Sequence, residues 1–260
     1  MNDSSFQTML TGIDASARSG CDQPGNKEWT MRVTVSDGTF ANFVSRPRPM
    51  EFSGAAVVLL HEIYGVNADV RSICEELAAQ GFLAIAPDLF WREQPGVDVS
   101  LSDEHDWQRR MDIYARYDFD RGIRDVAATI RSARTVGGAT GRIGVMGFGP
   151  GGLLSYLAAA RLPIDAAVAY YGQKIEQHLD EAHNVAVPLM IHLGEEDPLI
   201  PQAAQSEIRA ALGAKDNVVI WGYSGCGHAF ATHTGSQYHA EAAAVANERT
   251  FAFFERHLTP

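Results

Sequence analysis

The stretch MGFGPGG, residues 146–152, contains the main evidence for the fold of this 260-residue chain. It follows a short apolar run, RIGVM, and precedes a segment of small and apolar residues, LLSYLAAA. Glycines two positions either side of a central residue, between a strand and a helix, are typical of a nucleophile elbow. Such a turn normally presents a reactive side chain, but the central residue here is Gly149. The sequence therefore predicts the backbone of an elbow without its reacting atom.

Short apolar runs alternate with segments of helical periodicity on both sides of this stretch. Strands are predicted over residues 55–62, 82–90, 142–147, 165–172, 188–197 and 217–223, and helices over residues 70–81, 119–134, 151–160, 201–212 and 239–257. Near the start, two alternating runs flank Ser36-Asp37-Gly38 and predict a β-hairpin. Continuous apolar strands alternating with helices predict an α/β fold, a mostly parallel central sheet with helices on both faces.

The length and composition of the chain favour one folded unit. Residues 29–260 are predicted to form a single α/β domain, since 46% of the chain is hydrophobic and available for a core. Residues 1–28 are rich in Ser, Gly, Asp and Asn, and we expect an extension that wraps on the surface or is partly disordered. The oligomeric state stays open between a monomer and a small homo-oligomer.

Charge and cysteine usage argue against several classes of protein. The net charge is −11 without a basic stripe, so neither nucleic acid nor a membrane surface is an expected partner. The 3 cysteines are scattered without a C-x-x-C pair, which argues against a disulfide framework and favours a reducing cytoplasm. The sequence has no basic and apolar leader and no apolar run of about 18 residues. The histidines lack ligand spacing, so we expect no metal or other cofactor, and a small molecule as the partner.

Two polar residues follow the elbow along the chain, each of them after a predicted strand. After the elbow come Asp197, at the end of the strand PLMIHLG, and His228, in the loop after NVVIWGY. The order elbow, acid, histidine is the chain order of the α/β-hydrolase triad. Taken alone, Asp197 could cap the helix that begins near Pro201, and His228 could be a satisfied loop residue. Their order, each after a strand, favours a shared site.

A further strand end supplies a carboxylate and a backbone donor. Glu62 follows the strand at residues 55–62, where it would face a mostly apolar cleft. In a fold of this kind the loop after this strand provides one donor of the oxyanion hole, and the N–H of Ile63 is the candidate. The alternative is a surface glutamate with no role.

Long matching stretches give the chain a family resemblance that runs from Thr34 to His257. They are HEIYGVNADVR, PDLFWREQPG, GRIGVMGFGPGG, AVAYYG, GEEDPLIP, GCGHAF and ANERTFAFF. In these stretches the chain closely resembles dienelactone hydrolase (carboxymethylenebutenolidase). The resemblance implies an α/β-hydrolase fold and hydrolysis of small unsaturated lactones that bear a carboxylate.

The resemblance also implies roles for particular residues. The triad would hold a cysteine at the elbow, Asp197 as the acid and His228 as the base. Glu62 would hold and tune the thiol, and Arg92 would bind the substrate carboxylate. Apart from the resemblance, three further residues are expected as substrate contacts, with the cleft wall or core packing as the alternative for the last two, namely Tyr64, Tyr171 and Phe230.

Four departures from the family pattern change the expected chemistry. The cysteine position is Gly149, so no acyl-enzyme can form there. The next residue is Pro150, which lacks the N–H that normally completes the oxyanion hole. Thr232 stands where a second carboxylate-binding arginine is expected, and His61 stands where glutamine is common. Loss of the nucleophile and of a donor together indicates that acyl transfer through this position has been abandoned.

Three functional hypotheses remain open from the sequence. The first is an enzyme on this scaffold that uses Glu62, Asp197 and His228 for non-covalent acid/base chemistry, as a hydrolase, lyase, isomerase or cyclase. Here His228 acts as the base, and the volume vacated by the cysteine side chain, together with the cleft, can admit a water or a substrate atom. The second is a protein that binds a metabolite without turning it over. The third is a hydrolase with a relocated nucleophile, Cys226.

Overall fold

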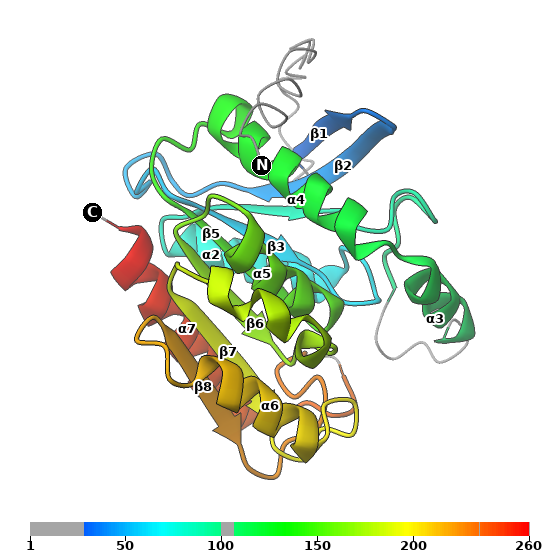
Figure 1. Ribbon diagram of the computed structural model, residues 1–260. Helices are drawn as coiled ribbons and strands as arrows, with labels where there is room; N and C mark the ends of the chain where they lie inside the picture. The colour runs from blue at the N-terminus through cyan, green and yellow to red at the C-terminus, as the bar shows by residue number, and fades with distance from the viewer. Residues whose placement is uncertain (1–28, 100–106, 234, 260) are drawn as a thin grey trace, which may run out of the picture.

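The computed structural model describes residues 29–99, 107–233 and 235–259, so the extension predicted for residues 1–28 lies outside the described residues. The strands are β1 (Trp29–Val35), β2 (Gly38–Ser45), β3 (Ala56–Leu60), β4 (Leu83–Pro87), β5 (Ile143–Phe148), β6 (Ala166–Tyr170), β7 (Leu189–Gly194) and β8 (Val218–Tyr223). They form one sheet in the order β1-β2-β4-β3-β5-β6-β7-β8 (Figure 1). The β1–β2 hairpin is antiparallel, β2 pairs antiparallel with β4, and all other pairs are parallel. The α/β class and the hairpin are confirmed.

Helices cover both faces of this sheet. They are α2 (Ala68–Ala79), α3 (Trp107–Arg116), α4 (Phe119–Ser132), α5 (Pro150–Arg161), α6 (Gln202–Leu212) and α7 (Ala240–Leu258), with a π-helical turn, η3 (Ala133–Gly137), and a 3₁₀ segment, η4 (Ile175–Asn184). In Figure 1, α4, α5 and α6 lie on the near face and α2 and α7 on the far face. Helix α2 packs against β2, β3 and β4, and α7 against β5, β6 and β7. No helix in the described part of the chain has the length and apolarity needed to cross a bilayer.

Two helical segments escaped prediction because they lack a wide apolar stripe. Helix α3 buries only Arg110 and Ile113, and the segment η4 buries only Ile175 and Ala182. The five central strands β3 to β7, in contrast, are buried at every residue, as their continuous apolar runs predict.

The strand order creates a switch point beside β3. From β3 the chain first crosses to β4 on one side and later to β5 on the other side. In open parallel sheets, ligands bind beyond the carboxyl ends of the strands at such a point. The register pairs Leu60 of β3 with Gly147 of β5. Glu62 and Gly149 each lie two residues beyond this pair, so the register itself places them side by side.

The turn from β5 into α5 has the predicted elbow conformation. Gly149 precedes the helix with φ 53° and ψ −116°, and Pro150 occupies the first helical turn. This conformation strains residues that carry a side chain. Gly151 is required for a different reason, because a Cβ there would collide with the carbonyl oxygen of Leu60. The glycines thus preserve an elbow whose tip has no side chain.

Candidate active site

Three residues from three strand ends meet beyond the carboxyl edge of the sheet. His228 Nδ1 lies 2.7 Å from Asp197 Oδ2, and His228 Nε2 lies 3.5 Å from Glu62 Oε1. The exposed fractions of these side chains are 16% for His228, 0% for Asp197 and 10% for Glu62. The structure therefore brings together the three residues that the sequence singled out as acid/base groups.

Asp197 is held by its own loop as well as by the histidine. Its Oδ1 accepts a hydrogen bond from the N–H of Leu199 at 2.8 Å, while Oδ2 faces the imidazole. Helix α6 is instead preceded by Pro201 as its capping residue, without a side-chain cap. The alternative role for Asp197, as the cap of α6, is therefore wrong.

The side chain of Glu62 occupies the space above Gly149. A Cβ built on Gly149 would lie 2.8 Å from Glu62 Oε1 and 2.9 Å from Glu62 Cγ. The volume released by the loss of a cysteine side chain is thus filled by a carboxylate. Glu62 is packed in this volume, and the adjoining cleft has an enclosed space of about 20 Å³ beside it. The acid/base array is Glu62, His228 and Asp197 in line, with Glu62 at the position of a nucleophile.

The surroundings of His228 favour its protonated form. Burial by itself lowers the pKa of the imidazole, but the hydrogen bond with Asp197 and the charge of Glu62 outweigh it and raise the pKa to about 9. The protonated ring directs Nδ1–H to Asp197 and Nε2–H towards Glu62. The role of His228 as the base stays a prediction, and the raised pKa favours the protonated ring at neutral pH.

Gln173 is a site residue that sequence reasoning missed. Its side-chain amide lies 3.5 Å from His228 Nε2, and it is flanked by Tyr171 and Lys174, both with positive φ (36° and 68°). Non-glycine residues in this conformation are uncommon and concentrate at functional sites. The contact joins Gln173 Nε2 to His228 Nε2, and which of the two nitrogens donates depends on the histidine tautomer. Nothing in the local sequence distinguishes this glutamine from a surface residue.

The loop after β3 is fixed by a neutral histidine. His61 Nε2 accepts a hydrogen bond from the N–H of Leu89 at 2.9 Å, so its proton must sit on Nδ1, which donates to the carbonyl of Glu62 at 2.5 Å. Burial lowers the pKa of His61 to about 4, which keeps the ring neutral. A glutamine has the same one-donor, one-acceptor capacity, so His61 can replace it as an anchor of this loop.

One of the two backbone donors expected for an oxyanion hole is missing. Pro150 has no N–H, and no described residue accepts a hydrogen bond from the N–H of Ile63. The assignment of Ile63 as a donor stays a prediction. Loss of one donor of this kind typically costs about 10²–10³-fold in turnover.

Arg92 does not reach the acid/base array. Its guanidinium is held by Asp37, in the β1–β2 turn, at 2.8 and 3.0 Å and by Asp125, on α4, at 2.5 and 3.0 Å. The guanidinium carbon also lies 4.2 Å from the ring centre of Trp91. Arg92 is not among the described residues that line the pocket beside Glu62. The expected contact between Arg92 and a substrate carboxylate is therefore not supported by the structure, because two protein carboxylates already hold this cation.

The predicted cleft-wall residues divide into one pocket residue and two supporting residues. Tyr64 lines the pocket. Tyr171 is fully buried, its hydroxyl pairs with Thr232 Oγ1 at 2.8 Å, and its ring meets the edge of His228 at 5.2 Å between centroids. Phe230 is also fully buried and packs on Tyr171. Tyr171 and Phe230 thus support His228 from behind, and the structure gives neither an exposed surface for substrate.

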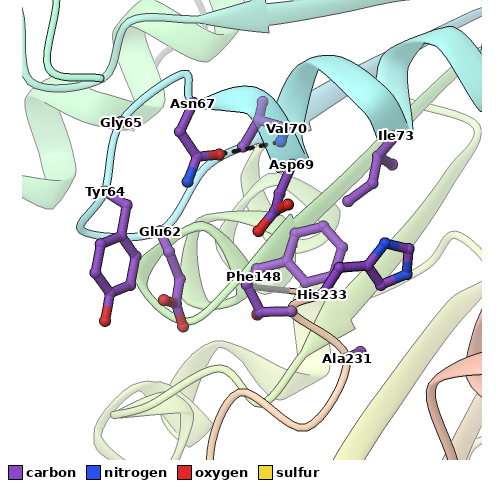
Figure 2. A pocket seen from close by; sticks show the side chains of 11 residues that line it. Glu62, Tyr64, Gly65, Asn67, Asp69, Val70, Ile73, Phe148, Ala231 and His233 are labelled. Atoms are coloured by element: carbon purple, nitrogen blue, oxygen red, sulfur yellow. Dashed lines mark hydrogen bonds between the residues drawn. The ribbon is translucent and has the colours of Figure 1, made fainter. Parts of the chain in front are cut away.

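Figure 2 shows the pocket that Glu62 lines. It lies between the loop after β3, the first turn of α2 and the segment that follows His228, and its described lining includes Tyr64, Asp69, Phe148, Thr232 and His233. The enclosed part measures about 20 Å³, and together with its open mouth the space is about 380 Å³. The enclosed part suits a water molecule beside Glu62, and the space opens to solvent at its mouth.

Cys226 has none of the properties of a nucleophile. Its side chain is buried, and burial raises the pKa of the thiol, as do the nearby charges of Glu196 and Glu195. A reactive cysteine requires the opposite, a lowered pKa in an electropositive setting. In the described ranges no group of three His, Cys, Asp or Glu side chains is placed to hold a metal ion.

The sheet order, the elbow and the acid and histidine that follow it define an α/β-hydrolase. A family model described as the dienelactone hydrolase family matches residues 40–258. The carboxymethylenebutenolidase of Pseudomonas putida is 35% identical over 205 residues, which cover 79% of this chain and 87% of that protein. Carboxymethylenebutenolidase 1 of Cupriavidus pinatubonensis is 29% identical over 215 residues, 83% of this chain and 91% of that protein. The chain belongs to the dienelactone hydrolase family and is an enzyme of that family.

The solved structures agree with this assignment. A Klebsiella pneumoniae structure attributed to a dienelactone hydrolase superposes with a TM-score of 0.78 at 27% sequence identity. The match covers 89% of this chain and 100% of that chain, so the likeness extends over the whole sheet and its helices.

Proposed function

We propose that this enzyme hydrolyses small lactones or comparably activated esters by direct attack of water, without an acyl-enzyme. The observation that carries the proposal is the position of the Glu62 carboxylate, above Gly149 and 3.5 Å from His228 Nε2. A base therefore occupies the place from which a nucleophile would attack. The pocket beside it has room for the attacking water.

Each residue of the array has a defined part in this route. Glu62 accepts a proton from water while the water oxygen bonds to the lactone carbonyl carbon. The Nε2–H of His228 and the N–H of Ile63 stabilise the oxyanion, and His228 then gives its proton to the ring oxygen as the C–O bond breaks. The proton on Glu62 returns to His228, and the product is the ring-opened hydroxy acid. Asp197 keeps Nδ1 protonated throughout.

The pH dependence of hydrolysis tests this assignment of roles. Because His228 must carry its proton and its pKa is about 9, kcat/KM is expected to be nearly constant from about pH 7 to 8.5 and to fall above about pH 9. The measurement is initial-rate hydrolysis of γ-butyrolactone-type substrates, corrected for the hydroxide reaction. A value of kcat/KM that instead rises through pH 9 would make His228 the base and contradict the proposal.

A stability control accompanies this profile. The pKa of His228 in the folded protein, about 9, exceeds its ordinary value of 6.5. Protonation of His228 therefore stabilises the fold fully below about pH 6.5, and this contribution is lost as the pH rises towards about 9. Circular dichroism at each pH shows whether the protein is still folded. Only rates measured on folded protein are used in the profile of kcat/KM against pH, so a decline there reports deprotonation of His228 and not unfolding.

A further inference from the structure

The side chain of Gln173 reaches the same ring nitrogen of His228 as Glu62 does. Gln173 follows β6, whereas His228 follows β8. The Nε2 atom of His228 lies 3.5 Å from Glu62 Oε1 and 3.5 Å from Gln173 Nε2. The other ring nitrogen, Nδ1, lies 2.7 Å from Asp197 Oδ2. Nε2 therefore has two neighbours at equal distance, a carboxylate that only accepts hydrogen bonds and an amide whose NH₂ group donates them.

The backbone around Gln173 is packed tightly against the elbow. A Cβ on Gly172 would lie 2.8 Å from the carbonyl carbon of Gly152, so this segment rests directly on the first turn of α5. Tyr171 and Lys174, on the two sides of this step, have φ values of 36° and 68°. This conformation is unfavourable for residues that carry a side chain, and it persists only where the surrounding structure enforces it. The fold thus holds Gln173 at a fixed place beside His228.

The two neighbours of Nε2 match the two protonation states of the ring. A protonated Nε2 donates, and the carboxylate of Glu62 is the partner that accepts. A deprotonated Nε2 presents a lone pair, and the NH₂ group of Gln173 is positioned to donate to it. Glu62 therefore stabilises the charged ring and Gln173 the neutral ring, while Nδ1 stays with Asp197 in both states.

The other groups around the imidazole do not take over the part of Gln173. Tyr171 presents its ring edge-on to His228, and its hydroxyl pairs with Thr232 Oγ1. The ammonium of Lys174 lies 4.9 Å from the ring centre of Tyr114. The charged partners of His228 are Asp197 and Glu62, and both favour the cation. Among these contacts, the amide is the one that favours a neutral imidazole.

We infer that Gln173 is a positioning residue, which holds the neutral form of His228 by donating an amide hydrogen bond to Nε2. The inference rests on the proposed function for its place in the reaction. In that route Nε2 gives its proton to the ring oxygen of the lactone as the C–O bond breaks, and Glu62 later returns one proton to Nε2. Between these two steps Nε2 is a bare acceptor. The amide keeps the ring in place to receive that proton.

The test measures the pKa of His228 by ¹⁵N nuclear magnetic resonance in the absence of substrate. Gln173→Met keeps the length of the side chain and removes the donor, so the neutral ring is destabilised. The pKa is expected to rise by about 0.5–1 unit above that of the wild type. Gln173→Leu also lacks a donor and should give a rise as well. Gln177→Met, at an exposed position four residues further on, is the matched control and should leave the pKa unchanged.

A third variant checks that the side chain at position 173 faces His228 in solution. Gln173→Glu adds a carboxylate beside Nε2 and is expected to raise the pKa of His228 further than Gln173→Met does. An unchanged or lower pKa in Gln173→Glu would show that this side chain does not reach the ring. A lower pKa in Gln173→Met and Gln173→Leu would show that the amide oxygen accepts from Nε2–H, and an unchanged pKa that the contact carries no hydrogen bond. Each of these results overturns the inference.

Rates give a second readout that a merely structural residue would not change in the same way. Gln173 is not among the described residues that line the pocket, so Gln173→Met should leave KM nearly unchanged and lower kcat by about 3–10-fold. The decline of kcat/KM at high pH should move upwards by the shift measured by resonance. A raised KM with unchanged kcat would make Gln173 a substrate contact and contradict the inference. If no lactone is hydrolysed, the titration still decides the inference, and only the proposed function fails.

Discussion

Glu62→Gln is expected to lower kcat/KM for lactone hydrolysis by about 10²–10⁴-fold, the usual contribution of a positioned acid/base group. Glutamine has nearly the same volume, so it still fills the space above Gly149 that the carboxylate occupies. It cannot accept a proton from water. It also removes one of the two charges that hold the pKa of His228 high, so the decline of activity at high pH should begin at a lower pH.

The controls for Glu62→Gln address folding and specificity. Thermal unfolding should still be cooperative, since the substitution neutralises a buried carboxylate without creating a cavity. Glu75→Gln makes the same chemical change on the exposed face of α2 and should retain full activity. A Glu62→Gln variant that hydrolyses lactones at the wild-type rate would exclude Glu62 as the base.

Asp197→Asn is expected to cause a comparable loss, about 10²–10⁴-fold at neutral pH, by changing the protonation of His228. The N–H of Leu199 must still donate to the side-chain oxygen of residue 197. The new amide therefore presents its NH₂ group to His228 Nδ1, which must then accept rather than donate. With Nδ1 deprotonated, the ring is neutral and its pKa falls, so the acid is largely absent at pH 7.

Nuclear magnetic resonance of the imidazole nitrogens measures this change together with the rates. In the wild type both nitrogens of His228 should be protonated at pH 7, and in Asp197→Asn only Nε2 should be. Asp216→Asn, at an exposed position before β8, is the matched control and should alter neither the spectrum nor the rate. A doubly protonated His228 in Asp197→Asn, with normal activity, would contradict the role given to Asp197.

Most of the fold could be predicted from residue patterns because those patterns report burial directly. The strands β3 to β7 are continuous apolar runs. The glycines on either side of Phe148 predict the tight turn from β5 into α5. Asp197 and His228 could be assigned for the same reason, since each directly follows a predicted strand. Helix α3 could not, because it buries only Arg110 and Ile113.

The departures at the site came from contacts between segments that are distant in sequence. The position of the Arg92 guanidinium is set by hydrogen bonds to Asp37 and Asp125. These residues lie 55 and 33 positions away in the sequence, so the local sequence around Arg92 does not indicate them. The position of the Glu62 side chain follows from the pairing of β3 with β5, and the charge of His228 follows from two carboxylates on different loops. A sequence motif can identify Glu62 and His228 as site residues. Which of the two carries the proton depends on how they pack together in the fold.

The direct-attack route is tested by a single turnover in ¹⁸O-labelled water with enzyme in excess over a lactone substrate. The product and the peptide that contains Glu62 are then analysed by mass spectrometry. Direct attack by water places one ¹⁸O atom in the carboxylate of the ring-opened product and none in the protein, and no substrate fragment is attached at any time point. An ¹⁸O atom in the Glu62 peptide, or a trapped fragment bonded to the chain, would show a covalent intermediate and contradict this route.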